Sequence, residues 1–149
     1  MNNVNRIQLD GDGYRLEEAL ANAALSPGHI VEMLSTGKVQ KHSTEGGFGL
    51  VAVAVEDALQ GKTITDAYAA DARVTYHIQT PGTRFQGILK VGEKVAKGAR
   101  LISDGEGRLI AETSADSGTT VRQIMAYAEE AVDLTDSDDA DTLIAVRAA

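Results

Sequence analysis

The chain has 149 residues, of which 43% are hydrophobic, so it is long and apolar enough for one domain with a buried core. Its 14 Lys and Arg residues against 22 Asp and Glu give a net charge of -8, and this negative field argues against nucleic-acid binding. Cysteine is absent, which excludes disulfides, thiolate metal sites and a cysteine nucleophile. No signal-like segment and no apolar run near the ~18 residues of a membrane span is present, so we expect a soluble protein made in the cytoplasm of the producing cell.

Residues 1–13 are predicted to form an extended N-terminal arm. The segment Val4–Leu9 alternates apolar and polar residues, and Asp10–Gly13 is a flexible stop. A free segment with strand character can add to the edge of a neighbouring sheet. A frayed terminus is the alternative interpretation.

Tyr14–Leu25 carries conflicting signals. Leu16, Leu20 and Ala23 fall at helical spacing, and Ala, Glu and Leu favour helices. The β-rich sequence that follows favours a strand. Both interpretations stay open.

The next stretches are predicted as strands because their apolar residues alternate or run together between turn-forming residues: Ile30–Leu34, Val39–His42, Phe48–Val55, Ala72–Ile78 and Arg84–Leu89. Phe48–Val55 is predicted to be a central strand buried on both faces. Ala72–Ile78 alternates and is predicted to be half exposed. Asp57–Lys62, which lies between these two, is predicted as a loop or a single helical turn.

Arg100–Ser103 and Arg108–Ala111 are predicted to pair as a hairpin around the reversal Asp104–Gly107. Asp-Gly between two apolar runs is a strong hairpin signal, because glycine adopts the positive φ that such turns need. Val121–Val132 mixes helical propensity with a position between strands. Thr142–Val146 is predicted as the closing strand.

Turns recur about every ten residues, as expected of an all-β domain. The predicted fold is therefore mainly β, a small β-barrel or sandwich with at most one or two short helices. It is predicted to form a single domain over residues 14–149, with no linker or second domain.

No motif indicates catalysis, a cofactor or a metal, so the protein is not expected to be an enzyme. His29, His42 and His77 stand alone, without the spacing of metal-binding histidines. A serine-hydrolase elbow is missing. Gly61–Thr63 resembles only the end of a phosphate-binding loop, because Glu56 stands where the first glycine of that loop would be.

Asp133–Asp141 contains five aspartates but lacks the glycine and glutamate that complete a calcium-binding loop, so a solvated loop is expected. Val91–Gly98 is similar to the turn that precedes the modified lysine of biotinyl and lipoyl carrier domains. Those domains carry that lysine at a hairpin tip. The tip here, Asp104–Gly107, has none, which disfavours the carrier interpretation.

Several short stretches, taken in order, resemble the capsid decoration (cement) proteins of tailed bacteriophages, which have small β-barrel (β-tulip) folds. The stretches are Ser26–Glu32, Val53–Lys62, Asp66–Tyr68, Pro81–Gly82, Val91–Gly98 and Glu130–Asp133. The resemblance covers most of the chain from Ser26 onward. Tyr14–Leu25 and Val121–Val132 depart from the pattern of that family because they lean toward helix.

The resemblance implies a structural virion protein on the outer surface of the capsid. Proteins of this family bridge neighbouring capsomers of the major capsid protein, stabilise the expanded head and commonly form homotrimers at threefold or quasi-threefold positions. Many weak contacts, repeated by symmetry, would together give the protein a high avidity for the capsid. The residues predicted to contact the capsid or the next protomer are Asn2, Asn3, Val4, Asn5, Arg6, Ile7, Gln8, Leu9 and Asp10.

Two alternatives to a decoration protein remain. The first is another virion β-protein, such as a head fibre base or a tail component. The second, less favoured, is a carrier-type barrel or an enzyme.

Overall fold

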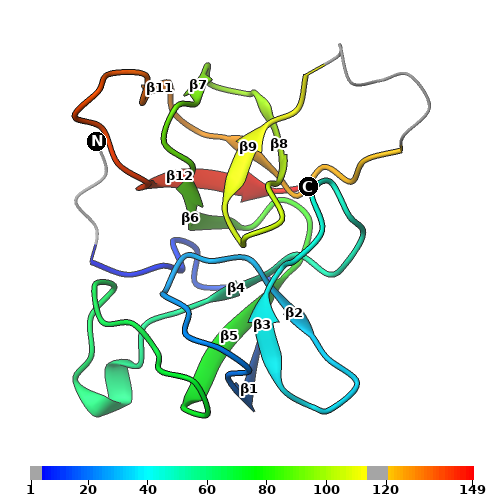
Figure 1. The fold of residues 1–149 in the computed structure, drawn as a ribbon, viewed down its shortest axis with the longest axis vertical. Coiled ribbons are helices and arrows are strands. Elements are labelled where there is room, and N and C mark those ends of the chain that lie inside the picture. Colours follow the sequence, from blue (N-terminus) through cyan, green and yellow to red (C-terminus); the bar gives the residue numbers. More distant parts are fainter. Residues whose placement is uncertain (1–4, 114–120) are drawn as a thin grey trace.

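The structure, a computed structural model, describes residues 5–113 and 121–149, and over these ranges it consists almost entirely of strands and turns (Figure 1). Within them the one helical element is the 3₁₀ turn η1 (Ala58–Gln60), where a single helical turn was an expected alternative. The predicted fold class, mainly β with a small barrel, is confirmed. The described ranges contain no helix with the length and apolarity needed to cross a bilayer.

Five strands close into a barrel, which occupies the upper half of Figure 1. In their order around the barrel they are β10 (Ala126–Ala128), β12 (Thr142–Ala148), β6 (Arg84–Leu89), β9 (Leu109–Ala111) and β8 (Arg100–Ser103). The longest pairing is antiparallel, between β12 and β6, and it sets Val146 opposite Phe85. β6 and β9 run parallel and pair only at Leu89 and Leu109. A small ribbon of β7 (Lys94–Val95) and β11 (Val132–Asp133) flanks the barrel.

The lower half of Figure 1, which we call the sheet unit, is built around an antiparallel sheet in the order β1-β5-β4. Its strands are β1 (Tyr14–Leu20), β5 (Arg73–Gln79) and β4 (Ala52–Ala54). A hairpin of β2 (Val31–Met33) and β3 (Val39–Lys41) packs on one face of this sheet, where Val31 and Val39 join the same apolar cluster as Val74.

The buried apolar side chains form two clusters. The cluster of the sheet unit draws only on residues between Ala19 and Ile78. The cluster of the barrel draws on β6 to β12 and also takes in Ile7, Ile30 and Val53 from the earlier part of the chain. The second cluster therefore fastens the sheet unit to the barrel.

Both stretches with conflicting signals contain strands and no helix. In Tyr14–Leu25 the strand is β1, each residue of which pairs with a residue of β5. In Val121–Val132 it is β10 and the start of β11. Helix propensity is a weak preference of a few tenths of a kcal/mol per residue, and sheet pairing overrides it here.

The prediction that Phe48–Val55 forms a central strand buried on both faces is wrong for its first half. Only Ala52–Ala54 is a strand, and Phe48 and Leu50 are 69% and 53% exposed. The side-chain amide of Gln123 donates to the carbonyl of Gly49 and accepts from its N–H, both at 2.8 Å, so this backbone bonds to a side chain instead of a sheet.

Ala72–Ile78 was predicted to be half exposed, and over that range Val74, Tyr76 and His77 are buried while the other residues are half-buried or exposed. Most side chains of β5 are buried, because β5 is the middle strand of its sheet. Its polar residues His77 and Gln79 are buried as well, and they can be because they are hydrogen-bonded.

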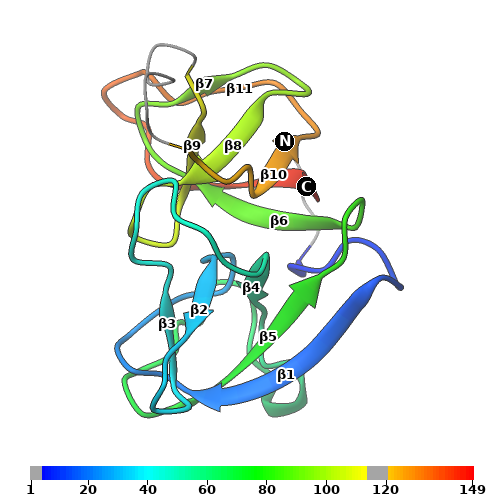
Figure 2. The same ribbon diagram turned by 90° about the vertical axis from the view of Figure 1, so that its right-hand side faces the viewer.

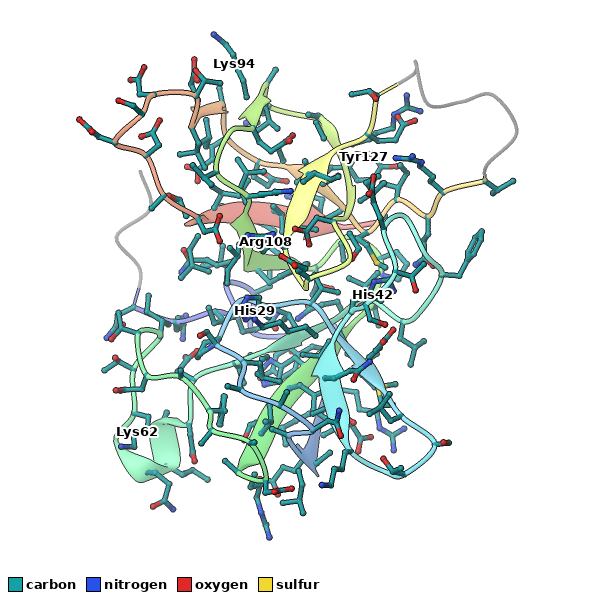
Figure 3. All side chains as sticks on the ribbon, viewed as in Figure 1. His29, His42, Lys62, Lys94, Arg108 and Tyr127 are labelled. Carbon is teal, nitrogen blue, oxygen red and sulfur yellow. The ribbon has the colours of Figure 1, made fainter. Side chains whose placement is uncertain are left out.

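The predicted hairpin of β8 and β9 is present, and its tip reaches into the sheet unit. The N–H of Ile30 donates to the carbonyl of Gly107 at 2.8 Å, and the N–H of Gly107 donates to the carbonyl of His42 at 3.1 Å. The buried Asp104 carboxylate bonds Arg108 at 2.8 Å. Figure 3 shows Arg108 beside His29, where the barrel meets the sheet unit. The hairpin tip thus connects the two halves of the molecule.

Candidate functional site

The predicted contact segment at the N-terminus is only partly free. Asn2, Asn3 and Val4 lie outside the described residues. Asn5 and Arg6 are exposed, Leu9 and Asp10 are half-buried, Gln8 is buried, and Ile7 is 0% exposed inside the barrel cluster. Part of the segment predicted to contact another protein is therefore buried within its own molecule.

Residues Ile7–Asp10 line the edge of β6 that faces away from β12. Gln8 pairs with Phe85 in an antiparallel bridge. The N–H of Gln86 donates to the carbonyl of Ile7 at 2.8 Å, and the N–H of Leu9 donates to the carbonyl of Arg84 at 3.0 Å. Instead of the predicted strand, the described part of this segment forms an isolated β-bridge at Gln8, and the sheet edge that it joins belongs to its own chain.

A buried polar network joins this segment to the sheet unit. The side-chain amides of Gln8 and Gln79 bond each other twice, at 2.6 and 3.1 Å, and Gln8 Oε1 lies 2.9 Å from Nδ1 of His77. The ring of Tyr14 stacks on His77 with centroids 4.0 Å apart. Burial lowers the pKa of His77 to about 4, so the ring is neutral near pH 7. The sequence signal for this network is the row of polar residues at alternate positions of β5.

The other two histidines are bound locally at separate places. Nδ1 of His29 accepts the N–H of Ser26 at 2.9 Å, and burial, with help from Lys41 and Arg108, lowers the pKa of His29 to about 4. Nδ1 of His42 lies 2.8 Å from the hydroxyl of Ser103. In residues 5–113 and 121–149 no group of three or more His, Asp or Glu side chains is placed to hold a metal ion.

The acidic loop Asp133–Asp141 is fixed at both ends by ion pairs with basic side chains. Asp133 pairs with Lys94 at 2.8 Å, and hydrogen bonds from Lys94 and Thr135 lower the pKa of Asp133 to about 2. Asp141 accepts the N–H of Val91 at 2.9 Å and pairs with Arg108 at 3.1 Å. These aspartates serve to fix the loop that leads into β12.

Large apolar side chains are exposed at several places on the described residues, and two of these places bear on binding. One is the loop that carries Phe48 and Leu50, where the backbone of Gly49 is bonded to Gln123. The other lies on the sheet unit, where Leu16 and Leu20 of β1 are 56% and 46% exposed. Next to β1, a groove of about 610 Å³ lies between the η1 loop and the sheet; its lining includes Glu18, Leu59, Lys62, Tyr68 and Arg73.

These features describe a molecule with exposed apolar side chains and an acidic loop that is fixed by ion pairs. No protein-family model matches the sequence, and no curated protein sequence matches it. Among solved structures, the fold is similar to the "N base" of head fiber gp8.5 in bacteriophage phi29, with a TM-score of 0.56 over 91% of this chain and 94% of that chain.

The fold of this chain is similar to that of a phage head fibre base. The two sequences are only 9% identical, so the likeness is one of fold. It extends along nearly the whole of both chains and takes in the barrel as well as the sheet unit. A phage head protein was expected from the sequence. The likeness found is to a head fibre base, which stood among the alternatives to a decoration protein.

Proposed function

We propose that this protein is a structural component of a bacteriophage virion, attached to the outside of the head in the manner of a fibre base. The observation that carries the proposal is the fold shared with the phi29 head fibre base along 91% of this chain. In this proposal the protein binds other proteins and neither catalyses a reaction nor holds a cofactor. In support, each of the three histidines makes a hydrogen bond at a separate place, so they do not form a common site.

The partner on the head is the major capsid protein, and the segment that meets it lies within Asn2–Asp10. The bonds of Ile7–Asp10 to β6 divide this segment in two. Ile7–Asp10 anchors the segment to its own barrel, and the residues before Ile7 reach the shell or the next protomer. Assembly as a homotrimer at threefold or quasi-threefold positions would repeat this contact by symmetry.

A second candidate is a decoration protein that bridges capsomers and stabilises the expanded head. The ordered sequence stretches from Ser26–Glu32 to Glu130–Asp133 favour it. A cryo-microscopy map of particles separates the two functions. A fibre base carries a further projection at its outer end, whereas a cement protein lies flat across the joints between capsomers.

The proposal is tested by adding the purified protein to phage heads that lack it and counting bound copies. We expect the full chain to bind at defined positions on the head. A variant without Met1–Asn5 should lose at least tenfold in apparent affinity and remain folded, because it keeps the anchor Ile7–Asp10. Lys97→Glu, an exposed change on the barrel, is the matched control for surface alteration. Absence of binding by the full chain would refute the proposed function, and equal binding by the shortened chain would refute the role of the segment.

A further inference from the structure

β1 has one edge paired with β5, and within residues 5–113 and 121–149 no strand pairs with its other edge. The bonds that continue its ladder, from the N–H of Thr80 to the carbonyl of Gly13 and from the N–H of Ala21 to the carbonyl of Ala72, are both 2.8 Å long. Because an antiparallel ladder alternates, the odd residues of β1 bond to β5 and the even residues direct their N–H and C=O groups outward. These outward residues are Tyr14, Leu16, Glu18 and Leu20. Figure 2 shows β1 as the outermost strand of the sheet unit.

β1 carries charged residues but lacks two other common protections of a strand edge, a bulge and a proline. Its seven residues pair in unbroken register, without a bulge or a proline. Leu16 and Leu20 expose about half of their side-chain surface. Two ion pairs within the chain offset its charges, from Arg15 to Glu17 at 2.7 Å and from Arg73 to Glu18 at 3.2 Å. A long, regular and partly apolar edge of this kind is a template for another strand.

We propose that β1 pairs antiparallel with β1 of a second copy of this chain, with Leu16 on the twofold axis. Leu16 then lies against the partner's Leu16, and Arg15 lies against the partner's Glu17. Tyr14 faces the partner's Glu18. The pairing forms about six backbone hydrogen bonds and joins the two sheets into one.

Charge selects both the partner and the register. If the twofold axis moved from Leu16 to Arg15, Arg15 would lie opposite the partner's Arg15. If it moved to Glu17, Glu17 would lie opposite the partner's Glu17. Like charges directly opposite each other destabilise a strand pair, whereas opposite charges stabilise it. With Leu16 on the axis, the strand is complementary to itself in both charge and apolar character. The inference concerns one edge only and does not rest on the proposed function.

Cysteine cross-linking tests the register directly, because the chain contains no cysteine of its own. We expect Leu16→Cys to form a disulfide-linked dimer under mild oxidation, since directly opposed residues lie about 5.5 Å apart between Cα atoms. Glu18→Cys, on the same face, is the matched control. Its two copies would lie roughly 13 Å apart along the strands, which is too far for a disulfide. Cross-linking of Glu18→Cys in place of Leu16→Cys, or of neither, overturns the proposal.

A charge exchange gives an independent measure of the same contact. By sedimentation velocity, Arg15→Glu and Glu17→Arg should each weaken self-association at least fivefold, and the double variant should recover it. Arg15 is exposed and Glu17 is half-buried, and both lie outside the two apolar clusters, so we expect folding to be retained and check it by circular dichroism. Lys97→Glu repeats the charge change of Arg15→Glu on the barrel and should leave association unchanged. Failure of the double variant to recover association overturns the proposal.

Discussion

Gln8 is one of the residues through which the N-terminal segment is bonded to the sheet unit, beside Ile7, whose N–H donates to Glu56. Replacing it by alanine leaves the buried Gln79 amide and His77 without their shared partner. Since an unsatisfied buried polar group costs about 1 to 3 kcal/mol, we expect Gln8→Ala to lower the free energy of unfolding by about 2 kcal/mol. Urea denaturation measures this loss. Gln60→Ala, an exposed change in η1, should alter stability by less than about 0.5 kcal/mol, and an equal loss in both variants would contradict the prediction.

The buried histidines make stability depend on pH. The pKa values of His29 and His77 are about 4 in the folded protein, below their ordinary value of 6.5. As the pH falls below 6.5 the unfolded chain takes up protons first, so stability that is complete above this pH is lost progressively toward pH 4. Between pH 7 and pH 5 we expect a loss of about 2 kcal/mol for each histidine.

Denaturation curves at pH 5, 6 and 7 check this expectation, because most carboxylates stay ionised over that range. His77→Gln keeps a hydrogen-bonding side chain but cannot take up the proton, so its stability should fall about half as steeply with pH. A slope equal to that of the unaltered chain would show that His77 is not the group responsible.

At the scale of an element, the tip of the β8–β9 hairpin is closely packed against the sheet unit at Gly107. Gly107 has φ 77°, and a Cβ there would lie 3.0 Å from the carbonyl oxygen of Ile30 and from Cβ of Lys41. Gly37, in the turn between β2 and β3, has φ 85° but open space around it. We expect Gly37→Ala to cost about 1 kcal/mol from backbone strain alone, and Gly107→Ala to cost about 2 kcal/mol more.

Thermal or urea unfolding of the two glycine variants separates strain from crowding, because both change glycine to alanine at a positive φ. Equal losses would mean that the hairpin tip is free to move away from Ile30. In that case the tip would not be the connection between the barrel and the sheet unit.

The strands that the sequence predicted well are those with a turn signal at each end. The predicted bounds of Arg84–Leu89 and Arg100–Ser103 coincide with β6 and β8, and the Asp-Gly reversal between β8 and β9 is where it was expected. Tyr14–Leu20 could not be settled from the sequence, since its leucines and glutamates are strong helix formers. Its strand conformation comes from pairing with β5, which lies more than fifty residues further along the chain.

The errors in predicted burial have a common physical cause, because the apolar or polar character of a residue does not by itself determine whether its side chain is buried. Phe48 and Leu50 look like core residues in sequence, yet they are exposed on a loop that Gln123 holds. Conversely, the polar His77 and Gln79 are core residues because each finds a hydrogen-bonding partner. Such partners come from distant parts of the chain and leave no local pattern.

The candidate contact segment shows the same limit. The alternation of Val4–Leu9 predicts a strand, but in the described part of this segment only Gln8 forms a β-bridge, and the alternation cannot tell which sheet edge it joins. The structure supplies the answer for Ile7–Asp10, because β9 pairs with only the end of β6 and leaves the rest of that edge open. The partner of the preceding residues stays a prediction, as do the homotrimer and the single domain over residues 14–149.

At the scale of the whole molecule, the barrel depends on residues from the very start of the described chain. Deletion of Met1–Asn5 removes no buried residue of the described structure and should change the free energy of unfolding by less than about 0.5 kcal/mol. Deletion of Met1–Asp10 also removes Ile7, which is fully buried, and should cost about 4 kcal/mol. Urea unfolding of the two shortened chains measures the difference, and similar stabilities would contradict the anchoring role of Ile7–Asp10.

Phe85 is paired with Gln8 on one edge of its strand and with Val146 on the other. These two neighbours come from the segment Ile7–Asp10 and from β12, which lie at opposite ends of the described chain. The hydrophobic cluster between Ala19 and Ile78 draws on no residue of β6 or β12, whereas the barrel needs both strands. We therefore expect the sheet unit to organise first and the barrel to close only when β12 pairs with β6.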